Sequence, residues 1–195
     1  PMDRDEVKSG EKIFAQLVLD EPAMIMAGDR FVIRSYSPVT TIGGGLILDP
    51  HPPKHKRFKA DVLEAFSVLL NGDDAAKVGV IIGRTGLTGI TLHELIVRTG
   101  MPRNLLRRIL DRLFSDREAI LLDKEEIRVV SHKPYSALLN HFLAELEQYH
   151  RKNPLREGLP REELRMSLGL GGNLKIFTMA MKDLEKQGKI VVDRE

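Results

Sequence analysis

An arginine cluster between positions 103 and 112 contains the residue types in this chain best suited to bind a polyanion. Its members are Arg103, Asn104, Arg107, Arg108 and Arg112. Residues three and four apart share one face of a helix, so a helix that begins after Pro102 would carry all five on its outer face. Guanidinium groups bind phosphate, and arginine and asparagine can both reach base edges. The pattern predicts a nucleic-acid surface.

A solvated helix face explains the same pattern without a ligand. Charged residues are ordinary on exposed helix faces, and Asp111 stands between Arg108 and Arg112, where pairing along the helix can neutralise charge. A second candidate surface is less basic. It contains Lys175 and Lys182 on a helix expected over residues 174–187, which also carries acidic residues. Both explanations stay open at this point.

No residues form a recognisable catalytic or metal-binding pattern. There is no nucleophile in a known active-site turn, and the acidic pairs at 125–126 and 162–163 fall in a turn and in a first helical turn, where solvation and the helix dipole favour them. His51 and His55 stand in a proline-rich stretch without a carboxylate or cysteine cluster beside them. We therefore expect no catalytic residue, no metal site and no cofactor site in this chain.

Composition restricts the remaining possibilities. The chain has 195 residues, which is long enough for one ordinary domain or two to three small ones, and its 42% hydrophobic content is enough for buried cores. The net charge of +2 is too small to indicate nucleic-acid binding by itself, and the absence of cysteine rules out disulfides and is compatible with the cytoplasm. No apolar run approaches the roughly 18 residues of a membrane span. Because the first residue is Pro1, we expect the chain to be part of a longer protein.

The first fifty residues have the pattern of β-structure. Residues 31–33 form a β-branched and aromatic run between turn signals, which predicts a buried strand. Residues 40–42 and 46–48 continue as strand around three glycines, which would allow a kink, a bulge or the close approach of another backbone. A phosphate loop is not indicated, because no Gly-Lys-Ser/Thr follows. With the alternating run 13–19, residues 11–49 predict three to five strands.

Helical periodicity replaces this pattern after a proline-rich basic stretch at 51–57. A helix with Val62 and Phe66 inward closes at Asn71-Gly72, and residues 74–84 fit either a helix or a strand. Two helices over residues 91–99 and 102–113 precede strands at 119–122 and 127–130, which is the order of a winged helix. A long helix over 135–149, helices over 160–168 and 174–187, and a strand at 189–192 repeat that order.

Two stretches carry a family resemblance. Residues 28–50, with the segments Asp-Arg-Phe-Val-Ile-Arg, Thr-Ile-Gly-Gly-Gly and Leu-Asp-Pro, resemble the end of the third domain of the selenocysteine-specific elongation factors, an elongation factor Tu-like β-barrel. Residues 150–165 resemble the second C-terminal winged helix of the same family. The resemblance implies a multidomain fold, β then mainly α, in which a partial β-barrel precedes two tandem winged-helix domains. The implied domains are the second half of the barrel (1–50), a linker (51–57), winged helix 1 (58–131) and winged helix 2 with a truncated wing (132–195).

Function also follows from the resemblance. It implies a non-catalytic part of a cytoplasmic translation factor that joins a GTP- and tRNA-binding body to winged helices that bind an mRNA hairpin. Selenocysteinyl-tRNA, this hairpin and the ribosome would be partners of the full-length GTPase, and GTP and magnesium would bind a domain that this chain lacks. The fragment itself would bind RNA weakly and without sequence preference, and would have no membrane partner. The alternative, based on the winged helices alone, is a DNA-binding transcription regulator.

Overall fold

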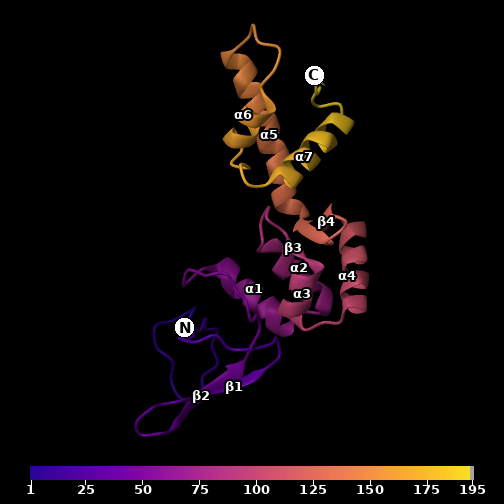
Figure 1. Cartoon of the computed structure of the whole chain (residues 1–195). Helices are drawn as coiled ribbons and strands as arrows, with labels where there is room; N and C mark the ends of the chain where they lie inside the picture. The colour runs from indigo at the N-terminus through magenta and orange to yellow at the C-terminus, as the bar shows by residue number, and fades with distance from the viewer. Residues whose placement is uncertain (194–195) are drawn as a thin grey trace. The chain divides into compact units, whose positions relative to one another are not determined.

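The computed structural model describes residues 1–193, so residues 194–195, the end of the predicted winged helix 2, lie outside the described part (Figure 1). The chain divides into two compact units. The first comprises Pro1–Ile81 and Leu92–Asp111, and the second comprises Ile82–Thr91 and the chain from Arg112 onward.

β-structure comes first and helices dominate afterwards, which confirms the predicted fold class. The elements are β1 (Arg30–Arg34), β2 (Thr41–Leu46), α1 (Ala60–Asn71), α2 (Asp74–Gly83), β3 (Ile90–Thr91), α3 (Leu92–Thr99), α4 (Arg103–Ser115), β4 (Ala119–Asp123), β5 (Arg128–Ser131), α5 (His132–Lys152), α6 (Arg161–Ser167) and α7 (Leu174–Lys186).

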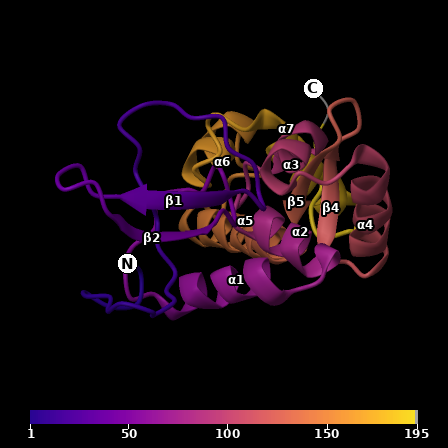
Figure 2. The same ribbon diagram turned by 90° about the horizontal axis from the view of Figure 1, so that it is seen from below.

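The three consecutive glycines lie inside β2, which pairs antiparallel with β1 in a hairpin (Figure 2). A Cβ atom at Gly44 would lie 2.5 Å from the carbonyl oxygen of Phe31, and one at Gly45 would lie 2.8 Å from the Phe31 ring. The glycines therefore allow the close approach of a neighbouring residue, which is one of the three possibilities that the sequence left open. The pairing is also irregular at the edge of this run, because Ile33 pairs with Gly43 and Arg34 pairs with Thr41, so that Ile42 is skipped.

Three predictions for this β-region were wrong. Within residues 11–49 the structure has two strands rather than three to five, and residues 13–19 belong to neither. The predicted buried strand is mostly exposed, with Val32 at 65% exposure, because no second layer covers the hairpin within residues 1–193. β2 ends at Leu46, so 47–48 are not in a strand, although the Ile47 N–H still donates to the Asp29 carbonyl at 2.8 Å.

Residues 51–57, the predicted linker, are fastened to the segment that precedes β1. The side chain of Gln16 donates from Nε2 to the Pro53 carbonyl at 3.1 Å and accepts from the His55 N–H at 3.1 Å. The ring of Phe66 on α1 contacts the rings of Phe14 and His55, with centroids 5.6 Å and 5.5 Å away. These contacts hold the proline-rich stretch against both the N-terminal segment and α1.

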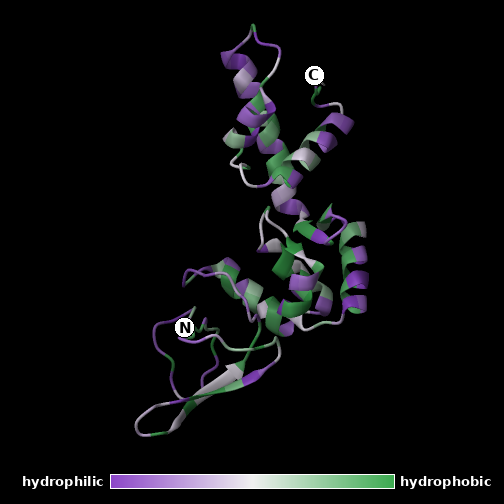
Figure 3. Cartoon of the chain, in the orientation of Figure 1, coloured by the Kyte–Doolittle hydropathy of each residue, from purple (hydrophilic) through white to green (hydrophobic). Residues whose placement is uncertain are grey.

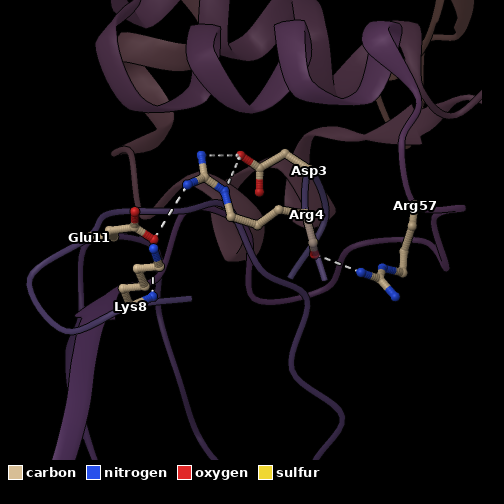
Figure 4. Close-up of polar contacts among 5 residues, drawn as sticks. All are labelled: Asp3, Arg4, Lys8, Glu11 and Arg57. Atoms are coloured by element: carbon tan, nitrogen blue, oxygen red, sulfur yellow. Dashed lines mark hydrogen bonds and ion pairs between the residues drawn. The ribbon is translucent and has the colours of Figure 1, made fainter. Parts of the chain in front are cut away.

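Further polar contacts connect the first residues of the chain to the end of this stretch (Figure 4). Arg57 donates from Nη2 to the Arg4 carbonyl at 2.6 Å, and Arg4 forms ion pairs with Asp3 at 3.1 Å and Glu11 at 3.4 Å. Nearby, the Phe58 N–H donates to the carbonyl of the buried Met2 at 2.8 Å. The N-terminal segment is thus held by its own contacts rather than by strand pairing.

A buried ion pair joins the end of the β-region to α3. Arg98 donates from Nε to Oδ1 of Asp49 at 3.2 Å and from Nη2 to Oδ2, and the two side chains are 12% and 8% exposed. Asp49 also accepts from the His51 N–H at 3.0 Å. α3 ends at Thr99, and Gly100 follows with a positive φ of 68°, which allows the sharp turn into α4 that a β-carbon would disfavour.

The second unit is built on one shared hydrophobic core. β3, β5 and β4 form an antiparallel sheet in that spatial order, and Val130 of this sheet lies in the same buried cluster as Phe142 of α5 and Phe177 of α7. Ile120 and Leu122 of β4 pack against this cluster. The sheet that follows α4 therefore shares a core with the helices α5, α6 and α7.

The predicted helices are confirmed, and residues 74–84, which the sequence left open, form the helix α2. The strand predicted at 189–192 is wrong, because these residues have no partner strand within residues 1–193; the Asp193 carbonyl instead accepts a bond from Arg161 at 3.0 Å. β3 was not predicted, since two residues are too short to give a periodic signal. None of the helices in the described chain is long and apolar enough to cross a membrane.

Candidate nucleic-acid interface

The arginine cluster lies on one face of α4. Hydrophobic residues at helical spacing bury the opposite face: Leu106, Ile109, Leu110 and Leu113 are at most 7% exposed. All five predicted residues are exposed, as their positions relative to this apolar stripe require. They are Arg103, Asn104, Arg107, Arg108 and Arg112. In Figure 3, α4 alternates between hydrophilic and hydrophobic bands, as expected for a helix with one polar and one buried side. We call the five residues the α4 basic face.

The arginines of the α4 basic face are incompletely neutralised. Arg112 forms an ion pair with Asp116 at 3.5 Å, with both side chains about half exposed or more (67% and 49%). No ion pair involves Arg103, Arg107 or Arg108 within residues 1–193. Pairing along the helix, which would explain the charges without a ligand, thus neutralises only the C-terminal end of the face. The N-terminal end remains positive.

The asparagine of the face is partly engaged. Its Oδ1 atom accepts from the Leu105 N–H at 2.9 Å, so the acceptor end of Asn104 is occupied by local backbone. Bidentate reading of adenine requires both the oxygen and the nitrogen of an asparagine amide. The face is therefore equipped for phosphate contacts more than for reading bases.

On α7, the structure separates the two predicted residues. Lys175 forms an ion pair with Asp123 at the end of β4, and the carboxylate is 7% exposed. The hydrogen bond from Lys175 is the main cause that lowers the pKa of Asp123, and a second hydrogen bond from the Glu125 N–H adds to it. The same hydrogen bond to Asp123 raises the pKa of Lys175. Both lysines are exposed, the Lys175 side chain at 64%, but Lys175 is already engaged by Asp123 inside the second unit.

Two neighbouring contacts complete this connection between α7 and the rest of the second unit. Asn173 caps α7 through its Oδ1 and donates from Nδ2 to the Leu87 carbonyl at 3.1 Å. The Tyr135 hydroxyl donates to Asp183 at 2.7 Å, and burial raises the pKa of this tyrosine. Sequence reasoning missed the roles of Asp123 and Asp183, because both partners lie about fifty positions away and no local pattern marks such a pair.

The histidines of the proline-rich stretch lie in ordinary surroundings. The ring of His55 packs edge-on against Phe66, at an interplanar angle of 75°. Within residues 1–193 no three or more histidine, cysteine, aspartate or glutamate side chains come together as a metal site would require. The α4 basic face is consequently the strongest candidate for a binding function in the part of the chain that the structure describes.

Comparison with known proteins identifies both ends of the chain. Residues 5–54 match the family model described as the β-barrel domain of the selenocysteine-specific elongation factor, and residues 143–195 match the one described as a winged helix of elongation factor SelB. A selenocysteine-specific elongation factor from Desulfomicrobium baculatum is 30% identical over 194 residues, which cover 100% of this chain and 30% of that protein. The chain thus spans less than a third of the length of that curated relative.

These matches define the class of protein first: an elongation factor whose β-barrel is followed by winged-helix domains. The class agrees with the order of elements described above, and it does not favour a DNA-binding regulator. The chain belongs to the SelB family of selenocysteine-specific elongation factors, and contains barrel and winged-helix parts of that family.

Proposed function

We propose that this chain connects the barrel of a SelB factor to its winged-helix region, within a longer cytoplasmic GTPase that delivers selenocysteinyl-tRNA to the ribosome at UGA codons marked by an mRNA hairpin. The order of the two matches carries the proposal: the barrel model at 5–54 precedes the winged-helix model at 143–195 in one chain. In this proposal GTP and magnesium bind a domain outside this chain, and the chain contributes no catalytic group.

The contacts inside the first unit support a connecting role. The ion pair between Asp49 and Arg98 and the two hydrogen bonds of Gln16 fasten the β-region, the proline-rich stretch and the helices to one another. A connector with such contacts holds the parts of this unit in a defined arrangement, whereas a flexible linker would let them move independently. In this proposal the chain therefore acts by holding these parts in place.

Loss of UGA decoding tests the proposal. We expect cells that lack the protein to terminate at the UGA codon of a selenoprotein reporter, and the intact protein to restore full-length product only when the hairpin follows the codon. Reporters with a sense codon in place of UGA serve as the control. Normal selenocysteine incorporation in its absence would contradict the proposal, as would a change in transcription as the only effect.

A further inference from the structure

We infer that the α4 basic face binds the phosphate backbone of double-helical RNA. This inference rests on the proposed function for the choice of RNA, and it goes further by assigning a ligand class to named residues of α4. The residues are Arg103, Arg107 and Arg108, with Asn104 beside them. Arg112 is a peripheral member, because Asp116 already neutralises it.

The positive charges at the N-terminal end of α4 do not stabilise the helix. Arg103 is its first residue, and its first turn contains no acidic side chain, although the helix dipole favours negative charge there. Arg103 and Arg107 are four residues apart, and like charges at this spacing destabilise a helix. A sequence that conflicts with local stability in this way is typical of a functional site.

The arrangement fits a regular array of phosphates. The cluster from 103 to 112 extends about 13 Å along the helix axis, and residues four apart on a helix have Cβ atoms about 5–6 Å apart. Guanidinium groups on a helix form a fixed row, whereas lysines on a loop would not. A double helix offers phosphates at regular intervals along such a row, and each contact would be a charge-assisted hydrogen bond.

A duplex is favoured over single-stranded RNA because the face has no stacking surface. Single strands are bound largely by aromatic side chains on which the bases stack. Phe114 is the aromatic residue of α4, and its side chain is half-buried, so it does not present an exposed ring on which a base could stack. The major groove of an A-form helix is too narrow for side chains to read, so the expected contacts are to phosphates and ribose hydroxyls, without sequence preference.

The experiment measures binding of the full chain to a 16-base-pair RNA duplex, and to a second duplex of unrelated sequence, as a function of salt. The test variant is Arg103→Gln/Arg107→Gln/Arg108→Gln. The matched control, Lys12→Gln/Lys133→Gln/Lys186→Gln, removes the same charge from exposed positions outside α4. Arg112→Gln is a second control, because its charge is paired already. Thermal unfolding verifies that each variant folds.

We expect the chain to bind both RNA duplexes equally. The test variant should lose about tenfold in affinity, and the slope of log affinity against log salt should fall by about 2, because each phosphate contact contributes roughly 0.7–0.9 to it. Both controls should change affinity less than threefold. The test variant should have the same Tm as the natural chain or a higher one, because repulsion within α4 is removed.

Several results would overturn the inference. If the triple lysine control loses as much affinity for RNA as the test variant, net charge alone is responsible for the binding. Sequence-specific binding to duplex DNA, tighter binding to single-stranded RNA, or binding to polyglutamate with none to RNA would assign the face to another ligand. Any of these results, in a protein that still decodes UGA, would remove this inference and leave the proposed function intact.

Discussion

Asp123 and Lys175 show how one ion pair can connect elements that are far apart in the sequence. The carboxylate at the end of β4 is nearly buried, and Lys175 stands at the start of α7. Because the pKa of Asp123 is lowered in the folded protein, its contribution to stability is present above the ordinary aspartate pKa and is lost as pH falls through the folded value. The raised pKa of Lys175 implies a corresponding loss at strongly alkaline pH.

The first prediction is therefore that Asp123→Asn lowers the stability of the second unit at pH 7. The variant should also reduce the acid sensitivity of stability below about pH 4, because the titrating group has been removed. Urea unfolding at a series of pH values measures both effects. Glu147→Gln on the exposed side of α5 is the control. A variant with the same acid dependence as the natural chain would show that the ion pair does not affect stability.

A second residue-scale prediction compares neighbouring glycines of β2. Gly44→Ala should destabilise the hairpin by roughly 1–3 kcal/mol, because its Cβ would lie 2.5 Å from the Phe31 carbonyl oxygen. Gly43→Ala should be neutral or slightly stabilising, since nothing lies within 4 Å of its Cβ position. Hydrogen exchange of the β1 and β2 amides measures the difference. Equal effects of the two substitutions would contradict this explanation of the glycine run.

At the scale of elements, the ion pair between Arg98 and Asp49 fastens α3 to the end of the β-region. Arg98→Met should cost roughly 3–5 kcal/mol, because it leaves a buried carboxylate without its cation. Asp49→Asn should cost less, since an amide can still accept from Arg98 and from the His51 N–H. The double variant should cost less than the sum of the two, with a coupling energy of roughly 1–3 kcal/mol. Additive effects in urea unfolding would mean that the two side chains do not interact.

Sequence patterns predicted the helices well and the β-region poorly, for a physical reason. A helix is stabilised by bonds within its own segment, so the apolar spacing of α4 or α5 is enough to predict it. A strand needs a partner, and the alternating run 13–19 has none in the described chain; Gln16 in that run instead bonds to the proline-rich stretch. The candidate face was predictable for the same reason as the helix, because all its residues belong to α4.

The contacts that the sequence could not indicate are those between elements. Lys175 was predicted as a nucleic-acid contact, since a lysine in the first turn of a helix resembles a free cation in the sequence. Its partner Asp123 comes from a different supersecondary unit, 52 residues away, and brings β4 against α7. The two residues, and with them the core shared by the sheet and α7, become visible only when the chain is folded.

At the scale of the molecule, the shared core of the second unit determines which elements lose stability when a core residue is substituted. Phe142 is fully buried, and its ring stacks on Phe177 with centroids 5.6 Å apart. The same buried cluster contains Val130 of β5, so the sheet and the helices α5 to α7 should lose stability together. A boundary at residue 131, expected from the winged-helix pattern, would instead let the sheet keep its stability when the helices that follow are weakened.

Phe142→Ala distinguishes these two cases. We expect a loss of roughly 3–5 kcal/mol from the cavity that it leaves, with faster hydrogen exchange at the amides of β4 and β5 as well as those of α7. Leu155→Ala is the matched control, because Leu155 is 97% exposed and its removal leaves no cavity. Faster exchange confined to residues 132–193 would show that the core is divided at residue 131. Faster exchange in the sheet would show that the elements on both sides of that residue unfold as one cooperative structure.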